Sequence, residues 1–447
     1  MTGKRTRTRR SSDEGRARAA EAAPPRIYSA TLGCRLNAYE TDAIVEELAS
    51  LCGAVRAPSP EEADVVLLNS CAVTAKAQAR SRKTLRSLAR RTRGMAVATG
   101  CVAEVYPEDL AEEGVLVVPN AGKAELAGRI VEMLGITAAE PGGEGRVDSI
   151  FPRIAPLGAA RTRTFLKVQD GCDNRCSYCI VPHARGGSRS QPREEVLRQA
   201  KDLREAGYRE IVLTGVDIAA YGRDLYGSHG YGLPDLVRGL LRLGGFRVRI
   251  SSMEPVGLTA DMLARMALPG VCRHFHLPLQ SGSDRILSAM RRGYGRAREE
   301  ELLDRIRGLF PGAAVGADII VGFPGETDDD FAQTLDLIAK HDLSYLHVFP
   351  FSPRPGTPAA DMDGMLSPHT VADRARALRE LGAEARRRFR LSRLGEDALC
   401  LVEGRSLDGA TAAMTDNYVP VLLDGDAEEG DMVPVTLTPY NIAWGRR

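Results

Sequence analysis

The sequence lacks several features that would place the chain outside the globular proteins of the cytoplasm. Its 447 residues contain no run approaching the roughly 18 apolar residues of a membrane-spanning helix. Residues 1–25 are basic and polar without a hydrophobic stretch, so we expect a disordered basic tail and no secretory signal. The net charge of +1 favours no class of partner, and no repeat of solenoid period is found. We therefore expect a cytoplasmic protein with no membrane partner.

Cysteine is the residue type whose abundance needs an explanation. The chain contains nine cysteines. Disulfides are rare in the reducing cytosol, so metal binding or catalysis is the better interpretation. A chain of this length can form two or three domains, each with its own core.

The hydrophobic pattern predicts an α/β protein with three folded parts. Strands and helices alternate over residues 26–136, which indicates a flavodoxin-like, doubly wound parallel domain. Residues 137–160 read as a linker. Residues 161–390 contain six candidate strands separated by helices, too few for an eight-stranded barrel, so we expect a partial (β/α)6 barrel. Residues 391–447 predict a small β-barrel.

Three cysteines lie within the stretch GCDNRCSYCI, spaced C-x3-C-x2-C: Cys172, Cys176 and Cys179. They follow the first strand of the predicted barrel, at the strand end where barrel enzymes carry their chemistry. Structural zinc takes four ligands, for which His183 would be the fourth candidate. Three thiolates suit a [4Fe-4S] cluster with one iron left open, and this is the prediction.

A second set of cysteines lies in the first domain. Cys34, Cys71 and Cys101 each end a predicted strand, beside the helix that follows. The carboxyl ends of parallel strands form one crevice, so these thiols should converge in space. Helix N-termini nearby would favour an anionic, sulfur-rich group, and we predict a second [4Fe-4S] cluster. The other three cysteines are interpreted as packing residues: Cys52, Cys272 and Cys400.

The loop CDNRCSYC resembles the cluster loop of radical S-adenosylmethionine (SAM) enzymes. The order of the three parts is similar to that of the methylthiotransferases over residues 26–447. The motifs that carry this resemblance are LGCRLN, NSCAVT, TGC, VQDGCDNRCSYCIVPHARG, RISSMEP, HLPLQSGSD, DIIVGFPGET and FSPRPGTPA. The resemblance implies two [4Fe-4S] clusters and two SAM molecules per turnover, one for the methyl group and one for the radical. It also implies an electron donor such as flavodoxin or ferredoxin.

Three substrates occur in this family: N6-threonylcarbamoyladenosine in tRNA, N6-isopentenyladenosine in tRNA, and an aspartate of a ribosomal protein. NSCAVT and LTGVDIAAYG (213–222) are similar to the threonylcarbamoyl branch. That branch implies conversion of C–H to C–S–CH3 at C2 of the adenine just 3′ of the anticodon. A non-catalytic RNA-binding protein with zinc is the alternative from another class.

The resemblance also implies a SAM pocket at the carboxyl ends of the barrel strands. Its candidate residues are Tyr178, Thr214, Gly215, Ser252, Glu254 and Gln280. The family pattern after the second strand has a Gly-Gly-Glu character, whereas this chain reads TGVD, so Asp217 is only a candidate for the carboxylate. Gly322, Pro324 and Gly325 are expected to shape a turn.

Basic helices are the candidate contacts to an anticodon stem-loop. Residues 75–93 carry eight basic residues and no acid, directly after Cys71. A second basic patch holds Arg386, Arg387, Arg388 and Arg390. The last part resembles a TRAM domain, an RNA-binding β-barrel, but residues 393–447 hold ten acids against four arginines. A phosphate-binding role for that part is therefore less favoured than one for the helices.

Overall fold

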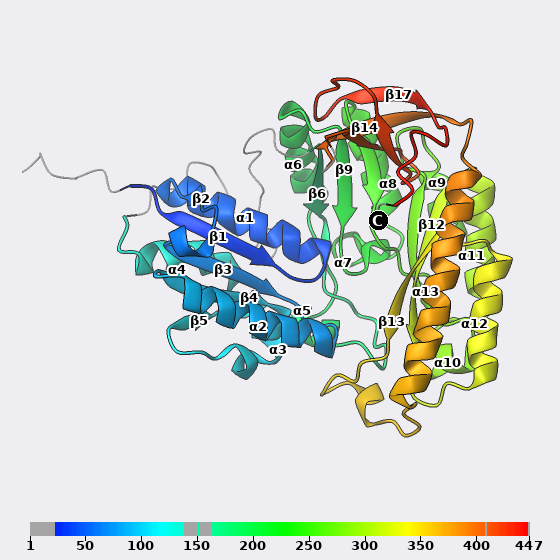
Figure 1. Cartoon of the computed structure of the whole chain (residues 1–447), viewed down its shortest axis with the longest axis horizontal. Coiled ribbons are helices and arrows are strands. Elements are labelled where there is room, and N and C mark those ends of the chain that lie inside the picture. The colour runs from blue at the N-terminus through cyan, green and yellow to red at the C-terminus, as the bar shows by residue number, and fades with distance from the viewer. Residues whose placement is uncertain (1–22, 138–150, 152–161, 407–408, 446–447) are drawn as a thin grey trace, which may run out of the picture.

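The fold is a computed structural model that describes residues 23–137, 151, 162–406 and 409–445. Most of the predicted tail, and the predicted linker except residues 137 and 151, lie outside the described residues. Figure 1 shows the first part beside the barrel and the last part over one end of it. The three-part α/β architecture is confirmed, while the domain boundaries stay predictions. None of the helices in these ranges combines the length and apolar character that a bilayer crossing requires.

The first part is a five-stranded parallel sheet in the order β2-β1-β3-β4-β5. This is the flavodoxin-like order, so the predicted fold is confirmed. The strands are β1 (Arg26–Thr31), β2 (Val55–Arg56), β3 (Val65–Ser70), β4 (Met95–Gly100) and β5 (Val115–Val117). The helices are α1 (Arg35–Cys52), α2 (Ala75–Arg91), α3 (Cys101–Val105) and α4 (Leu126–Met133). The pattern did not predict β2, because its two residues are exposed and leave no hydrophobic signal.

The central part is the predicted six-stranded partial barrel. Its parallel strands run β6-β9-β10 and β11-β12-β13, and a bridge between Val248 and Val271 joins the two halves. The strands are β6 (Arg163–Lys167), β9 (Glu210–Thr214), β10 (Arg247–Ile250), β11 (His274–Gln280), β12 (Ala314–Val321) and β13 (Tyr345–Pro350). The longer helices are α6 (Arg193–Glu205), α8 (Leu233–Leu243), α9 (Ala260–Met266), α11 (Arg296–Leu309), α12 (Asp328–Lys340) and α13 (Pro368–Leu391). Shorter elements are β7 (Gln169–Asp170), α5 (Val181–Arg185), β8 (Arg189–Ser190), α7 (Arg223–Tyr226) and α10 (Asp284–Ala289).

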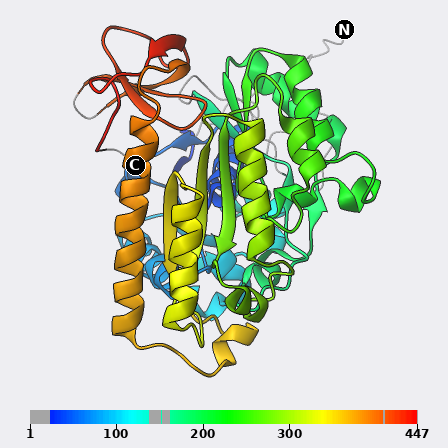
Figure 2. The ribbon, with the colours of Figure 1, turned by 90° about the vertical axis from the view of Figure 1, so that its right-hand side faces the viewer.

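Alternation along the barrel strands separates a hydrophobic outer face from a polar lumen. On β12, Ala317 and Ile319 join the core under the helices, which Figure 2 shows as a layer outside the strands. Gly316 and Asp318 therefore face the lumen. A side chain at Gly316 would overlap the ring of Tyr345, so glycine lets this tyrosine cross the lumen.

The last part is a four-stranded antiparallel sheet in the order β16-β15-β14-β17. The strands are β14 (Asp397–Arg405), β15 (Thr411–Met414), β16 (Pro420–Leu423) and β17 (Met432–Thr436). It packs at the amino ends of the barrel strands, where Arg247 and Arg249 donate to backbone carbonyls of Leu399 and Asp416.

The acidity of this last part has a structural role. Arg273 pairs with Glu396 and Asp416 at 2.7 Å, and Arg163 pairs with Glu403. Three of the ten acids therefore bind the domain to the barrel.

Candidate functional site

The first cysteine trio lies along one edge of the first sheet. Cys34 precedes α1, Cys71 follows β3, and Cys101 opens α3 directly after β4. Gly33 has φ +103°, and a Cβ on it would lie 2.8 Å from the sulfur of Cys71, so only glycine allows the two loops to approach. Burial, Cys101 and Cys34 together raise the pKa of Cys71 to about 12. The three cysteines therefore lie at neighbouring strand ends, within electrostatic range of one another.

The second trio, Cys172, Cys176 and Cys179, lies on the loop after β7. A side chain at Gly171 would overlap the carbonyl oxygen of Gly187, so glycine closes the base of this loop. Burial is the main cause that raises the pKa of Cys172 to about 11 and of Cys179 to about 12, and neighbouring thiols of the trio add to it. At neutral pH these two thiols are therefore protonated, and a bound cation would be needed to stabilise them as thiolates.

The spacing within the trios is too wide for a single ion. Among the described residues, only His276, Asp318 and His347 bring three candidate ligand atoms within 4.8 Å of one another. At least one pair of sulfur atoms in each cysteine trio is therefore farther apart. Sulfur atoms on a tetrahedral zinc ion lie about 3.8 Å apart, given Zn–S bonds of about 2.3 Å. In this structure neither trio is therefore spaced as the ligands of one zinc ion would be, and cysteine thiols are the donor type that holds iron–sulfur clusters.

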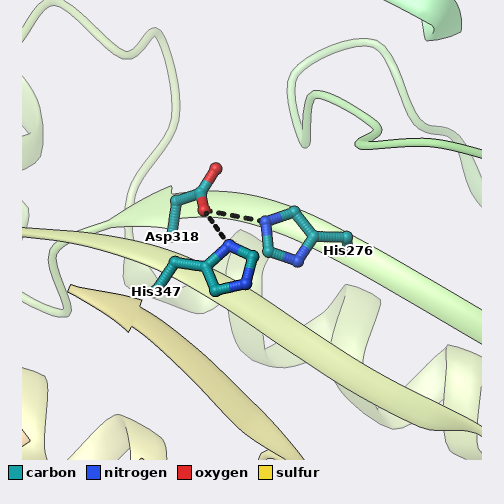
Figure 3. A group of neighbouring side chains, drawn as sticks. All are labelled: His276, Asp318 and His347. Atoms are coloured by element: carbon teal, nitrogen blue, oxygen red, sulfur yellow. Dashed lines mark hydrogen bonds and ion pairs between the residues drawn. The ribbon is translucent and has the colours of Figure 1, made fainter. Parts of the chain in front are cut away.

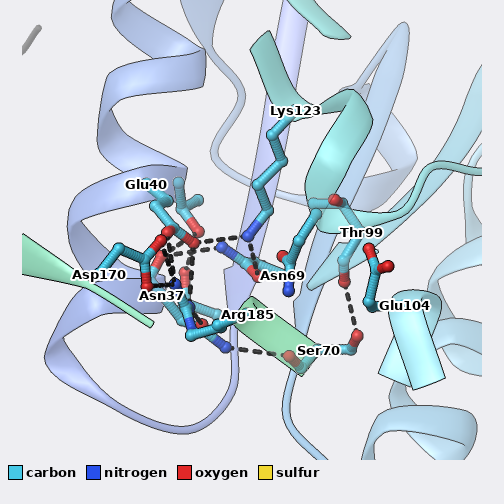
Figure 4. A network of polar contacts seen from close by, with 12 residues as sticks. Asn37, Glu40, Asn69, Ser70, Thr99, Glu104, Lys123, Asp170 and Arg185 are labelled. Carbon is cyan, nitrogen blue, oxygen red and sulfur yellow. Dashed lines mark hydrogen bonds and ion pairs between the residues drawn. The ribbon is translucent and has the colours of Figure 1, made fainter. Parts of the chain in front are cut away.

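A buried polar network joins the two trios (Figure 4). Arg185, at the end of the helix that follows the second trio, donates to Glu40 at 2.8 Å and to Asp170 at 3.0 Å. It also donates to the Asn37 side chain at 2.7 Å. Asn37 in turn donates to the carbonyl oxygen of Ser70 at 2.9 Å, one residue before Cys71. The loops of both trios therefore converge on one guanidinium group.

This network places positive charge beside the first trio. Burial alone would raise the pKa of Glu40, but Arg185, Lys123 and Lys167 hold it well below its usual range. Burial raises the pKa of Cys101, and Arg185 and Lys123 oppose that rise. The cations therefore favour thiolates and an anionic cluster at this position.

A second arginine organises the predicted SAM pocket. Arg292 lies 3.3 Å from the sulfur of Cys176 and 3.4 Å from the hydroxyl of Tyr178, and it pairs with Glu254. Burial raises the pKa of Glu254 to about 7, although Arg292 opposes the shift. Asp217 accepts a hydrogen bond of 3.0 Å from Asn174, which lies inside the cysteine loop. Tyr178, Glu254 and Asp217 thus lie around the second trio.

The remaining predicted pocket residues occupy strand ends on the same side of the barrel. Thr214 ends β9, and Gly215 packs so closely on Gln169 that an added Cβ would lie 2.8 Å from its side-chain oxygen. Ser252 follows β10. Gln280 ends β11 with φ +74°, a conformation rare outside glycine.

Sequence reasoning missed Arg185, Asn37, Glu40 and Arg292. Arg185 lies within VPHARG and Asn37 within GCRLN, parts of motifs that carry the family resemblance, yet neither residue carries a spacing signal of its own. Arg292 is separated from Cys176 by more than a hundred residues, so no local pattern could relate them.

The basic surface of α2 is smaller than its sequence suggests. Acids from neighbouring elements pair with Arg82, Arg86 and Arg91. Five basic residues form no ion pair with the described part of the chain: Lys76, Arg80, Lys83, Arg90 and Arg93. On α13, Arg386 and Arg387 line a groove with Trp444, and Arg390 donates to carbonyls of the C-terminal segment.

Two family models match the chain. Residues 166–338 match the radical SAM superfamily, and residues 26–119 match the uncharacterized protein family UPF0004. The radical S-adenosylmethionine methyltransferase TsrM from Kitasatospora setae shares the fold, with a TM-score of 0.54 at 16% identity over 75% of each chain.

Curated relatives cover nearly the whole chain. A threonylcarbamoyladenosine tRNA methylthiotransferase MtaB from Aquifex aeolicus is 35% identical over 91% of this chain and 98% of its own length. This chain belongs to the radical SAM tRNA methylthiotransferase family. A second MtaB, from Bacillus subtilis, is 36% identical over 92% of this chain and 94% of its own. A tRNA-2-methylthio-N(6)-dimethylallyladenosine synthase from Alkalilimnicola ehrlichii is 35% identical over 85% and 87%.

Membership confirms the predicted enzyme class. The methylthiotransferase modifies tRNA by radical SAM chemistry, which implies SAM and a [4Fe-4S] cluster. The relatives are named for two different nucleoside substrates, so membership in the family does not by itself identify the substrate of this chain.

Proposed function

We propose that the methylthiotransferase converts N6-threonylcarbamoyladenosine in the anticodon loop of tRNA to its 2-methylthio derivative, using two [4Fe-4S] clusters. The observation that carries the proposal is the convergence of both cysteine trios on Arg185. An adenine held between the trios would face both groups at once, which replaces a bimolecular encounter by a fixed orientation.

In this proposal, Cys172, Cys176 and Cys179 hold the radical SAM cluster, and Cys34, Cys71 and Cys101 hold the auxiliary one. Bound there, the clusters supply the radical and the sulfur chemistry of the family. Arg292 orients Tyr178 and Glu254 around the SAM site, and Thr214, Gly215, Ser252 and Gln280 line the same strand ends. Arg185, Lys123 and Lys167 compensate the negative charge between the trios.

The substrate assignment is supported by the relatives named for threonylcarbamoyladenosine and by the stretches NSCAVT and LTGVDIAAYG. Dimethylallyladenosine is the second candidate, because relatives with that name are equally similar. A cytoplasmic location and a flavodoxin or ferredoxin as electron donor stay predictions.

Mass analysis of tRNA nucleosides from cells with and without the gene tests the substrate. We expect loss of the 2-methylthio group from threonylcarbamoyladenosine alone, restored by the wild-type gene and not by a Cys172→Ala gene. If the 2-methylthio group is lost from dimethylallyladenosine instead, dimethylallyladenosine is the substrate and threonylcarbamoyladenosine is not. An unchanged nucleoside profile together with an altered ribosomal protein would overturn both.

A further inference from the structure

A chain of polar side chains, here called the lumen chain, crosses the barrel lumen. The Tyr345 hydroxyl lies 2.8 Å from Nε2 of His274 and 3.1 Å from Nδ1 of His276. Asp318 then accepts hydrogen bonds from His276 at 2.8 Å and from His347 at 3.2 Å (Figure 3). These residues lie on β11, β12 and β13, and the described mechanism uses none of them.

Two histidines of the lumen chain, His274 and His347, each have a ring nitrogen without a hydrogen-bond partner among the described residues. His274 is 2% exposed, and its Nδ1 has no hydrogen-bond partner in the described part of the chain. Burial, Arg249 and Arg35 hold the pKa of His274 well below its usual range, so the ring is neutral and can accept a hydrogen bond. The side chain of His347 is half-exposed and uses only Nδ1 on Asp318. The ring of His347 can therefore pair with a bound group, whereas His274 is covered by the ring of Tyr418, 4.4 Å away between centroids.

Arg35 brings a positive charge to the same lumen from the first part of the chain. It opens α1 directly after Cys34 and shares a helix face with Tyr39, whose hydroxyl lies 3.4 Å from the side-chain oxygen of Gln199 on a barrel helix. Figure 1 shows this end of α1 beside the barrel strands. Arg35 contributes to lowering the pKa of His274 and opposes the rise that burial causes in the pKa of Tyr345, which is the direction expected of a cation on this side of the barrel.

Arg35 has no anionic partner among the described residues. It is half-buried and forms no ion pair or hydrogen bond with the residues that the structure describes. The buried arginines nearby are paired, as Arg249 is with Glu210 at 2.7 Å and Arg185 is with Glu40. A half-buried guanidinium with five donors in a planar fork suits a carboxylate ligand.

We propose that Arg35 binds the carboxylate of the threonylcarbamoyl substituent and that His347 pairs with its hydroxyl or ureido group. This inference rests on the proposed function and names the residue that selects the substrate. On adenine, C2 and N6 are separated by only N1 and C6, so a substituent on N6 must lie close to the trios when C2 does. Arg35 adjoins Cys34 and meets that requirement. A dimethylallyl group is a hydrocarbon and offers Arg35 nothing to bind.

The alternative use of His276, Asp318 and His347 as a cation site is less favoured. Asp318 already accepts N–H groups from both imidazoles through the same oxygen atom. Those nitrogens would have to lose their protons before they could bind a metal ion.

Three anticodon stem-loop RNAs test the proposal. One carries threonylcarbamoyladenosine, the second its neutral carboxamide, and the third dimethylallyladenosine. Wild-type holoenzyme is compared with Arg35→Met, with the charge-preserving Arg35→Lys, and with Arg56→Met. Arg56 is an exposed arginine that pairs with Asp42 at 2.9 Å and serves as the matched control.

We expect wild-type kcat/KM to fall about 10- to 100-fold from the acid to the carboxamide, the range for a charged hydrogen bond. Arg35→Met should lose a similar factor on the acid and nothing on the carboxamide, while Arg35→Lys keeps part of the preference. Iron content and SAM cleavage without RNA should match those of Arg56→Met.

Two results would overturn the inference alone: equal wild-type rates on acid and carboxamide, or an Arg35→Met variant that loses both substrates equally. A wild-type enzyme that modifies only the dimethylallyl RNA would overturn the proposed function, and this inference with it.

Discussion

The fold brings the two cysteine trios together in opposite ways. Cys172, Cys176 and Cys179 lie within eight residues on one loop, so local sequence brings them together. Cys34, Cys71 and Cys101 lie on three separate strand ends, and only the order of the parallel sheet brings them to one edge. The first trio, which begins at Cys34, therefore depends on the folded domain. The second trio, which begins at Cys172, depends on a loop closed at Gly171.

The charges around the trios differ as well. Three cations surround Glu40 beside the first trio, while Glu254 beside the second has one arginine and the neighbouring Asp217. The first environment favours negative charge, and the second disfavours an additional one. Under the proposed function, the first site would therefore favour an anionic sulfur cluster, and the second would favour the positive sulfonium of SAM.

Removing either trio is the strongest way to break the comparison. Alanine at the three second-trio positions should abolish SAM cleavage to 5′-deoxyadenosine, because no cluster is then held near the SAM pocket. Alanine at the three first-trio positions should spare cleavage and abolish methylthio transfer. Iron should fall from about eight to about four per chain in either variant, as measured anaerobically. Loss of SAM cleavage in a folded first-trio variant would show that the sites do not divide the work.

Arg185→Met tests whether the two sites are held together by one guanidinium. It leaves Glu40 and Asp170 buried with fewer partners, and removing one member of a buried ion pair costs about 3–5 kcal/mol. Urea unfolding should show that loss, and methylthio transfer should fall more than SAM cleavage. The exposed Arg56→Met variant should change stability by less than about 1 kcal/mol. Equal losses in the two variants would mean that Arg185 does not join the trios.

Opposite pKa shifts predict opposite pH dependence at the two sites. The lowered pKa of Glu40 gives stability that is present above the pKa of an unfolded glutamate and is lost as pH falls. The raised pKa of Glu254, about 7, gives stability that is complete below the unfolded pKa and is lost as pH rises through 7.

In the wild-type protein the free energy of unfolding should therefore decrease from pH 5 to pH 8. In Glu254→Gln this decrease should be smaller, by up to about 3 kcal/mol. Part of the slope should remain, because burial also raises the pKa of Glu299. Glu40→Gln should instead lower stability at neutral pH. Urea titrations at several pH values measure both effects. An unchanged slope in Glu254→Gln would mean that Arg292 keeps this carboxylate charged.

The sequence predicted the parts of this comparison that depend on periodicity and local spacing. The βα alternation, the six barrel strands and the edge position of Cys34, Cys71 and Cys101 all follow from where strands end. It did not predict Arg185 or Arg292, because a buried arginine is recognised by partners that the fold brings from distant positions. It also overstated the charge of α2, whose acidic partners lie on other elements.

The smallest expected effect concerns which basic helix contacts the RNA phosphates: α2, beside the first trio, or α13. Lys83 and Arg90 on α2 are unpaired in the described structure, whereas Arg86 on the same face pairs with Glu112. If α2 contacts phosphates, Lys83→Ala or Arg90→Ala should each lower the slope of log affinity against log salt by about 0.7–0.9. Arg86→Ala should change it less, because Glu112 already neutralises that charge. Binding of an anticodon stem-loop at several salt concentrations measures the slopes. A slope that responds only to Arg386→Ala would place the RNA over α13, away from the helix that follows Cys71.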